Sequence, residues 1–211
     1  GYDRFHMRMP SCQNHLIQEV LKVQPNTVVV LHNGFPVEMP WADGANAILN
    51  LWYAGEGAGW AMANLIAGDL NPSGKLAVTI PKRLTDCPAA LDFPHEQDVS
   101  VYREGIFVGY RWYDARRIEP LFPFGHGLSY TKFRYDRIRA EATDGGYIAR
   151  VTLTNTGDRE GSEVVHLYVK PPKGVLFRPE RELKAFAKVS LKPGEQKTVS
   201  MALERQDFSC Y

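Results

Sequence analysis

The chain is poor in the residues and patterns that define several large classes of protein. It has three cysteines in 211 residues, Cys12, Cys87 and Cys210, and none has the close spacing of a zinc site or a redox motif. This argues against a disulfide framework. The formal net charge is only +1, from 25 basic and 24 acidic residues. Such a balance argues against nucleic acid or an anionic membrane as the main partner.

Long hydrophobic runs without polar residues are also missing. Residues 47–68 are mostly apolar and about long enough to cross a bilayer. However, they contain Asn50, Glu56, Asn64 and four glycines, so a spanning helix would bury a charge in lipid. We therefore reject a membrane span. The first residues show no signal-peptide pattern, and the sequence is compatible with a secreted or a cytoplasmic location.

The first 80 residues alternate between helix-like and strand-like segments. Apolar spacing predicts a helix over residues 11–23 with Ser11 as its N-cap, and a second helix that ends at Ala67 with Gly68 as its C-cap. Residues 27–31 are typical of a strand covered on both faces. Further strands are predicted at residues 47–52, also buried, and 76–80. This succession indicates a mostly parallel sheet with helices on its faces.

The pattern changes after this region. Residues 81–120 lose their periodicity but are rich in aromatic residues, which a flexible linker would lack, so we expect them to pack along both halves of the chain. From Phe133 onward the period becomes two. Alternating segments separated by turns predict strands at residues 147–154, 163–169 and 197–203. Short strands at this spacing indicate a β-sandwich.

A glycine-rich loop at residues 55–59 follows a predicted strand and opens a helix, so a dinucleotide or phosphate site has to be considered. Its spacing is GxGxG rather than GxGxxG, and the next strand ends without an acidic residue that would bind a ribose hydroxyl. A tight turn that packs the helix on the sheet is the better interpretation. Glu56 in this loop is interpreted as a favourable charge at a helix N-terminus rather than a catalytic acid.

The other titratable residues do not form a catalytic pattern. Glu38, Glu96 and Glu104 lie on predicted loops without a paired carboxylate, where single carboxylates are usually solvated. The six histidines lack metal-ligand spacing, and no nucleophile elbow occurs. His126, between two glycines, is interpreted as a hydrogen-bonding residue of a tight turn. We predict no metal and no cofactor.

The segment from Tyr2 to Arg4 is open to two interpretations. An Asp–Arg pair beside an aromatic residue can fix a loop and present a ring to the face of a sugar. The same residues also fit an ordinary surface loop with a weak salt bridge. The residues by themselves do not decide between the two.

Several segments resemble the C-terminal part of family 3 glycoside hydrolases, and they occur in that family's order. They are residues 1–4 (Gly-Tyr-Asp-Arg), 25–31 with Gly34, Pro36 and Val37, 71–76, 102–114, 122–130, 151–157, 182–186 and 191–195. The stretch 119–133 resembles the junction between the α/β sandwich domain and the fibronectin type III-like domain of that family. The resemblance implies a mostly parallel α/β layer with flanking helices, followed by an all-β fibronectin type III-like sandwich.

On this resemblance we divide the chain into three parts. Residues 1–82 correspond to the C-terminal part of the α/β sandwich domain, 83–130 to an aromatic-rich packed linker, and 131–211 to the fibronectin type III-like domain. The family's last domain continues past a motif like residues 205–211 into a final strand pair. We therefore expect the sandwich to be truncated, without its last strands.

The resemblance further implies a retaining β-glucosidase, which releases terminal non-reducing β-D-glucosyl residues. Retention needs a carboxylate nucleophile and an acid/base carboxyl about 5–5.5 Å apart. In the family the nucleophile is an Asp in an N-terminal (β/α)8 barrel, and in many members the acid/base is a Glu directly before the motif that starts here at Gly1. We therefore expect a fragment with no catalytic residue, inactive by itself. Tyr2 would line the aglycone side of the pocket as a substrate-binding residue.

Two other classes of function stay open. The sandwich is also compatible with a stand-alone carbohydrate-binding or interaction module, although it has few aromatic residues beyond Tyr147, Tyr168 and Phe177. A nucleotide-binding α/β protein rests on the glycine loop alone. The leading hypothesis names a β-glucoside and the missing barrel domain as partners. It leaves the sugar, the linkage and a homo-oligomeric state undetermined.

Overall fold

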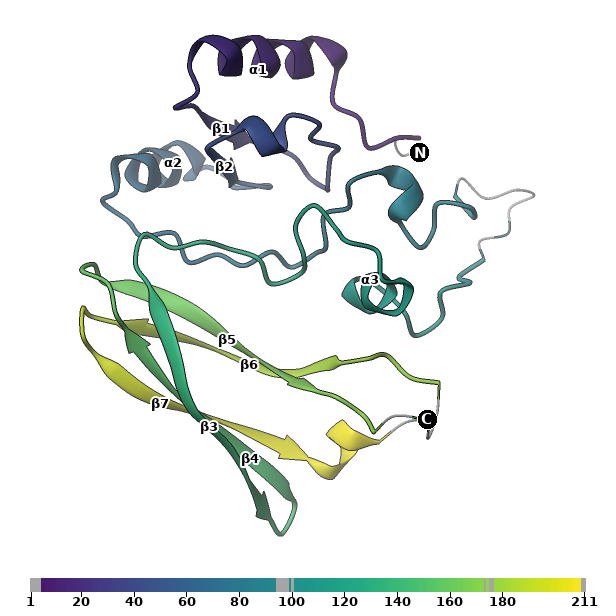
Figure 1. The fold of residues 1–211 in the computed structure, drawn as a ribbon, viewed down its shortest axis with the longest axis vertical. Coiled ribbons are helices and arrows are strands. Elements are labelled where there is room, and N and C mark those ends of the chain that lie inside the picture. Colours follow the sequence, from purple (N-terminus) through teal and green to yellow (C-terminus); the bar gives the residue numbers. More distant parts are fainter. Residues whose placement is uncertain (1–4, 94–98, 100, 173, 175–176, 210–211) are drawn as a thin grey trace.

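The computed structural model describes residues 5–93, 99, 101–172, 174 and 177–209. In this part of the chain an α/β layer lies beside a β-sandwich, and an extended linker runs between them (Figure 1). The elements of the first layer are α1 (Ser11–Val23), β1 (Val28–Leu31), β2 (Ala47–Asn50) and α2 (Ala58–Ala67). The linker contains a further helix, α3 (Tyr110–Arg116). Both predicted helices of the first layer are confirmed.

The strands β1 and β2 pair in parallel, with Leu31 opposite Asn50, as predicted. Helix α1 packs on one face of β1, where Ile17 and Leu21 contact the buried cluster that contains Leu31. The prediction that β1 is covered on both faces is wrong for the described residues, because Val28 on the other face is 47% exposed. Strand β2 is not buried either, since its residues are half-buried or exposed. Among the described residues, the buried cluster of this layer includes Val29 and Leu31, on the face of β1 that α1 covers.

The helix termini are set by backbone geometry. Helix α1 spans the predicted residues, Ser11–Val23, but its N-cap is Pro10 rather than Ser11. The Pro10 carbonyl accepts a hydrogen bond from the Gln13 N–H at 3.0 Å, and proline fits here because its fixed φ suits a helix start. Helix α2 ends as predicted at Gly68, whose φ of 82° is left-handed and costs glycine little.

The third predicted strand, residues 76–80, does not join the parallel sheet. Instead its backbone pairs with the linker: Ile80 forms an antiparallel bridge with Phe122, and the Leu76 N–H donates to the His126 carbonyl at 2.8 Å. The prediction of a strand here is wrong: residues 77–78 form a bend, and the hydrogen-bonding partners at either end come from much later in the sequence. The linker thus becomes part of the first layer.

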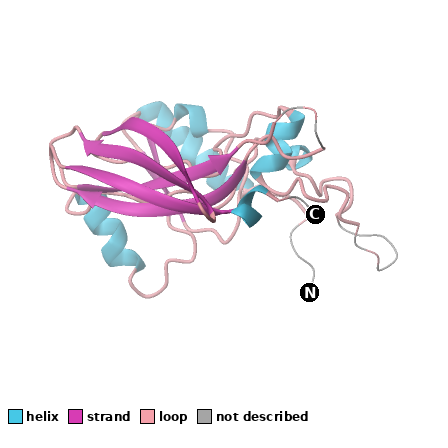
Figure 2. Cartoon of the chain, turned by 90° about the horizontal axis from the view of Figure 1, so that it is seen from below, coloured by secondary structure: helices cyan, strands magenta, loops and turns pink. Residues whose placement is uncertain are grey.

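The second half is an antiparallel β-sandwich, seen from below in Figure 2. One sheet has the order β3–β4–β7 and the other pairs β5 with β6. Its strands are β3 (Phe133–Thr143), β4 (Gly146–Asn155), β5 (Gly161–Val169), β6 (Glu182–Leu191) and β7 (Gln196–Glu204). The predicted strands fall within β4, β5 and β7. Leu153 and Leu191, both fully buried, lie in the core between the sheets.

Candidate functional site

The predicted substrate-binding residue, Tyr2, lies outside the described residues, as does Glu96. The nearest described segment along the sequence is residues 5–8, which begins three positions after Tyr2.

Residues 5–8 lie along the loop that follows β1. The Met7 carbonyl accepts a hydrogen bond from the Glu38 N–H at 2.8 Å, and Arg8 forms a parallel bridge with Glu38. The Glu38 carboxylate also accepts a hydrogen bond from the Leu84 N–H at 3.1 Å. Glu38 is therefore a structural residue that joins three segments, and not the solvated loop carboxylate expected from the sequence.

A sulfur cluster anchors the side chain of Met7, which is 9% exposed. The Cys87 thiol donates to the Met7 sulfur at 3.8 Å, and the Tyr113 hydroxyl donates to the Cys87 sulfur at 3.9 Å. Burial raises the pKa of both the Cys87 thiol and the Tyr113 hydroxyl. Both groups therefore stay protonated near neutral pH, as donors in a packing contact rather than as nucleophiles.

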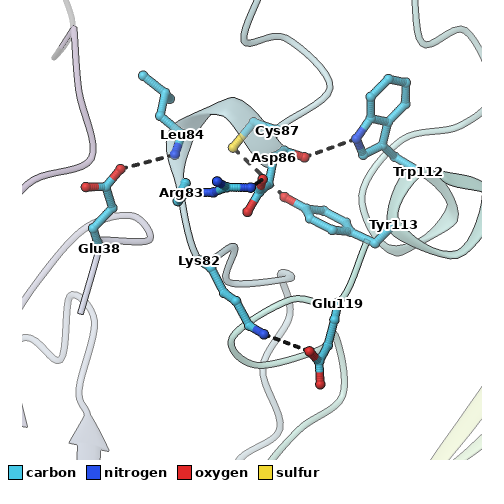
Figure 3. A network of polar contacts seen from close by, with 9 residues as sticks. All are labelled: Glu38, Lys82, Arg83, Leu84, Asp86, Cys87, Trp112, Tyr113 and Glu119. Carbon is cyan, nitrogen blue, oxygen red and sulfur yellow. Dashed lines mark hydrogen bonds and ion pairs between the residues drawn. The ribbon is translucent and has the colours of Figure 1, made fainter. Parts of the chain in front are cut away.

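The turn that carries Cys87 is tied to helix α3 (Figure 3). Trp112 donates its indole N–H to the Asp86 carbonyl at 3.1 Å. The Asp86 carboxylate is buried and accepts a hydrogen bond from Arg83 at 3.1 Å. Near this turn, Lys82 Nζ and Glu119 Oε2 form an exposed ion pair 2.7 Å apart. The linker thus packs against residues 5–8 and holds them in place.

A groove of about 580 Å³ lies beside this network. Its lining is mostly apolar and includes Met7, Phe35, Cys87 and Tyr113. It also includes Thr79, whose buried hydroxyl has no hydrogen-bond partner within the described residues. The groove therefore borders the same segment that follows Tyr2.

The two halves of the chain are joined by a nearly buried ion pair. Lys75 Nζ lies 3.1 Å from Glu163 Oε1, with side chains that are 16% and 12% exposed. Tyr135 donates its hydroxyl to the same carboxylate oxygen at 3.0 Å. This pair links the turn before residues 76–80 to β5.

Aromatic rings from the linker and β5 pack around the junction. Phe124 stacks on His166 with ring centroids 5.7 Å apart, and Tyr110 meets Tyr168 edge-on at 5.8 Å. Burial lowers the pKa of His166, and the Lys75 charge lowers it further, whereas Glu163 opposes the shift. Together with the bridge between Ile80 and Phe122, these contacts confirm the prediction that the aromatic-rich linker packs along both halves.

His126 also belongs to this junction. Its ring stacks on Phe122, its N–H donates to the Pro123 carbonyl, and its carbonyl accepts from Leu76. Burial lowers its pKa, and Lys75 adds to this effect. The interpretation of His126 as a hydrogen-bonding turn residue is confirmed.

The described residues contain no group of histidines, cysteines and carboxylates that would hold a metal ion. Among them, no helix is long and apolar enough to cross a membrane. Glu56 lies just before the N-cap of α2, Gly57, and Asp86 is engaged by Arg83. The described contacts of Glu38 and Cys87 hold the N-terminal segment at Met7.

Comparison with known proteins identifies the family to which the chain belongs. The model of the glycosyl hydrolase family 3 C-terminal domain matches residues 1–110, and the model of the fibronectin type III-like domain matches residues 163–211. The chain belongs to glycoside hydrolase family 3. Its α/β layer and its fibronectin type III-like sandwich confirm the fold class expected from the resemblance.

Characterised relatives and solved structures carry the same fold. The chain is 51% identical over 215 residues to thermostable beta-glucosidase B of Acetivibrio thermocellus, covering 100% of this chain and 28% of that protein. The structure of the Kluyveromyces marxianus beta-glucosidase in complex with glucose matches with a TM-score of 0.95 and 46% identity, covering 98% of this chain and 25% of that one. The Thermotoga neapolitana beta-glucosidase 3B in complex with glucose gives 0.93 and 37%, covering 97% and 30%. The chain thus spans about a quarter to a third of the length of these family 3 relatives.

Proposed function

We propose that the chain is the C-terminal part of a retaining β-glucosidase that hydrolyses terminal non-reducing β-D-glucosyl residues. The observation that carries the proposal is the match, over nearly the whole chain, to beta-glucosidase structures that contain glucose. A stand-alone binding module is not favoured, since the similar proteins are beta-glucosidases several times longer than this chain.

In this proposal the chain positions residues and does not supply the catalytic carboxylates. Tyr2 lies beside the acid/base and lines the aglycone side of the pocket. The anchoring of Met7 by Glu38 and Cys87 supports this role, because it fixes the backbone that continues from Tyr2. The division into residues 1–82, 83–130 and 131–211 is kept as part of the proposal.

The proposed partner within the same polypeptide is an N-terminal (β/α)8 barrel domain. Exposed apolar side chains on and after α2 support a covered surface there: Trp60 is 78% exposed, and Ile66 and Leu70 are about half exposed.

The test compares the full-length polypeptide with residues 1–211 alone, using an aryl β-glucoside. We expect hydrolysis with retention by the full-length protein and none by residues 1–211. Turnover by residues 1–211 would contradict the positioning role. A full-length protein that is folded but inactive on β-glucosides would contradict the proposed activity.

A further inference from the structure

The segment around His126 is enclosed on two sides, and each neighbouring glycine allows one of the two contacts. A Cβ atom at Gly127 would lie 2.1 Å from the Gly74 carbonyl oxygen, and a Cβ atom at Gly125 would lie 2.8 Å from Cε1 of His166 in β5. Gly125 also has a left-handed φ of 81°, which costs glycine little. The segment therefore fits between the α/β half and β5 because the residues on either side of His126 have no side chain.

This close packing brings ionisable side chains from both halves together. Lys75 donates to the Gly127 carbonyl at 2.7 Å and forms an ion pair with Glu163 of β5 at 3.1 Å. Gly127 follows His126 directly, and His166 lies on the same strand as Glu163. When both imidazoles are protonated, three cations share the one Glu163 carboxylate.

The buried position of the two histidines makes their protonation unfavourable while the halves are joined. Burial lowers the pKa of His126 and of His166, and the Lys75 charge lowers both further, whereas Glu163 opposes the shift of His166. If the junction opens, the imidazoles are hydrated and regain their ordinary pKa of about 6.5. The open form then binds protons more readily. The joined form is therefore favoured most above pH 6.5 and loses stability as the pH falls below this value.

The other charges around His166 form a pair of their own. Phe124 stacks on the imidazole, and Tyr168 meets it edge-on with ring centroids 6.0 Å apart. Arg181 lies over the Tyr168 ring at 5.4 Å, but it donates two hydrogen bonds to the Asp114 carboxylate at 2.7 and 3.0 Å. This pair neutralises itself, so the balance of charge at His166 depends on Lys75 and Glu163.

Tyrosines complete the surroundings. Tyr135 of β3 donates its hydroxyl to Glu163, and Tyr110 of α3 meets Tyr168 edge-on. Burial raises the pKa of Tyr135 and of Tyr168, so neither hydroxyl ionises near neutral pH. The charge that changes near pH 6.5 is that of the histidines.

We infer that this cluster is a pH-sensitive latch between the two halves of the chain, closed at neutral pH and opened in acid by protonation of His126 and His166 beside Lys75. Repulsion among the three cations then exceeds their attraction to Glu163, and the linker separates from β5. The α/β layer and the sandwich have separate buried clusters, so each half keeps its fold when the latch opens. The latch is made by contacts within the chain and does not depend on the proposed function.

The Leu183 N–H reports whether the latch is closed. This amide of β6 donates to the Tyr110 hydroxyl of α3 at 2.7 Å. Tyr110 packs on Phe124, the ring that stacks on His166. Hydrogen–deuterium exchange of the full-length polypeptide, measured by peptide mass spectrometry, therefore compares peptides that contain Leu183 with peptides from residues 147–153 of β4. The β4 backbone pairs with β3 and β7 inside the sandwich, and its exchange reports the sandwich itself.

Exchange is expressed relative to the intrinsic rate at each pH. We expect exchange at Leu183 to be about three- to tenfold faster at pH 5.5 than at pH 7.5, and exchange in β4 to change less than about twofold. The double variant His126→Phe and His166→Phe keeps aromatic rings that cannot titrate, and it should lose this difference. His15→Phe removes an exposed histidine of α1. It is the matched control and should behave like the parent.

A second variant tests the latch at neutral pH. His166→Lys introduces a permanent positive charge beside Lys75 and should accelerate exchange at Leu183 already at pH 7.5. Unchanged exchange in this variant would overturn the latch, as would equal exchange of the parent at the two pH values. The same pH difference in the double variant would also overturn it. Equal acceleration in β4 and at Leu183 would do so too, because the sandwich itself would then lose structure in acid.

Discussion

Glu163 has partners on both sides of the junction: it forms an ion pair with Lys75 of the α/β half at 3.1 Å, and it accepts a hydrogen bond from the Tyr135 hydroxyl of the sandwich at 3.0 Å. Lys75 also donates to the Gly127 carbonyl at 2.7 Å. Both buried charges therefore have additional hydrogen bonds, the condition under which a buried pair offsets its desolvation. One carboxylate thus fixes the position of the two halves relative to each other.

Removing one member of this pair should destabilise the protein. Lys75→Met leaves the Glu163 charge without its cation and is expected to lower the free energy of unfolding by about 1–3 kcal/mol. Denaturant unfolding of the full-length protein measures this. The exposed pair of Lys82 and Glu119 gives the control, because Lys82→Met should cost less than about 1 kcal/mol. Equal effects of the two substitutions would show that the junction pair contributes no more than a surface contact.

Asn155, which is fully buried, holds the end of the sandwich nearest the linker. Its amide donates to the carbonyls of Arg159 and Leu191 at 2.7 and 3.0 Å, and its oxygen accepts from the Thr131 hydroxyl at 2.6 Å. Asn155→Ala should cost about 2–4 kcal/mol of unfolding free energy, because several buried partners are left unsatisfied.

The matched control is Asn46→Ala, which removes an exposed contact with Asn26 and should change the unfolding free energy by less than about 0.5 kcal/mol. Thermal or denaturant unfolding followed by circular dichroism measures both variants. A cost below about 1 kcal/mol for Asn155→Ala would mean that water replaces the lost hydrogen bonds.

Thiol labelling should separate two of the cysteines. Cys12 is exposed and Cys87 is partly buried, with a pKa raised by burial. A maleimide or disulfide reagent, read out by peptide mass spectrometry, should modify Cys12 well before Cys87. Met7→Ala removes the sulfur that covers Cys87 and should accelerate its labelling. Unchanged labelling of Cys87 in Met7→Ala would indicate that Met7 does not control access.

We expect the stability of the protein to depend on pH because of the histidines at the junction, His126 and His166. Burial and Lys75 lower the pKa of His166 in the folded protein, so the unfolded chain binds the proton more readily. Stability is therefore lost as the pH falls below the ordinary histidine value of about 6.5. Denaturant unfolding at pH 7.5 and 5.5 measures the change. His166→Phe keeps the ring stack but cannot titrate, and it should reduce the pH dependence. If the unfolding free energy of this variant changes equally between the two pH values, groups other than His166 cause the effect.

The sequence predicts the elements whose partners are close along the chain. The helices around Leu16 and Leu65 follow from apolar spacing, and Gly68 marks a helix end because its left-handed φ suits glycine. Helix α3 was not predicted, because Tyr110 and Tyr113 lie in a stretch without clear periodicity. The contacts around Cys87 join residues that are 80 and 26 positions apart, and no local pattern encodes such distances.

The candidate site also has features that the sequence predicts and features that only the fold shows. The resemblance points to Tyr2, which lies outside the described residues, so its role stays a prediction. The roles of Glu38 and Lys75 emerge only from the fold, since each acts through partners on other segments. The close approach of Tyr53 to Gly34, between the loops after β2 and β1, is likewise seen only in the fold. Their contact depends on the parallel pairing of β1 and β2.

The pairing of Ile80 with Phe122 also has a consequence for synthesis on the ribosome. The backbone groups of residues 76–80 find these partners only after roughly 40 further residues have been added, which takes about 2–8 s at typical translation rates. During that interval the edge formed by residues 76–80 is open to other strands or chaperones. The α/β layer therefore completes its edge late, at nearly the moment when the first strand of the sandwich begins to emerge.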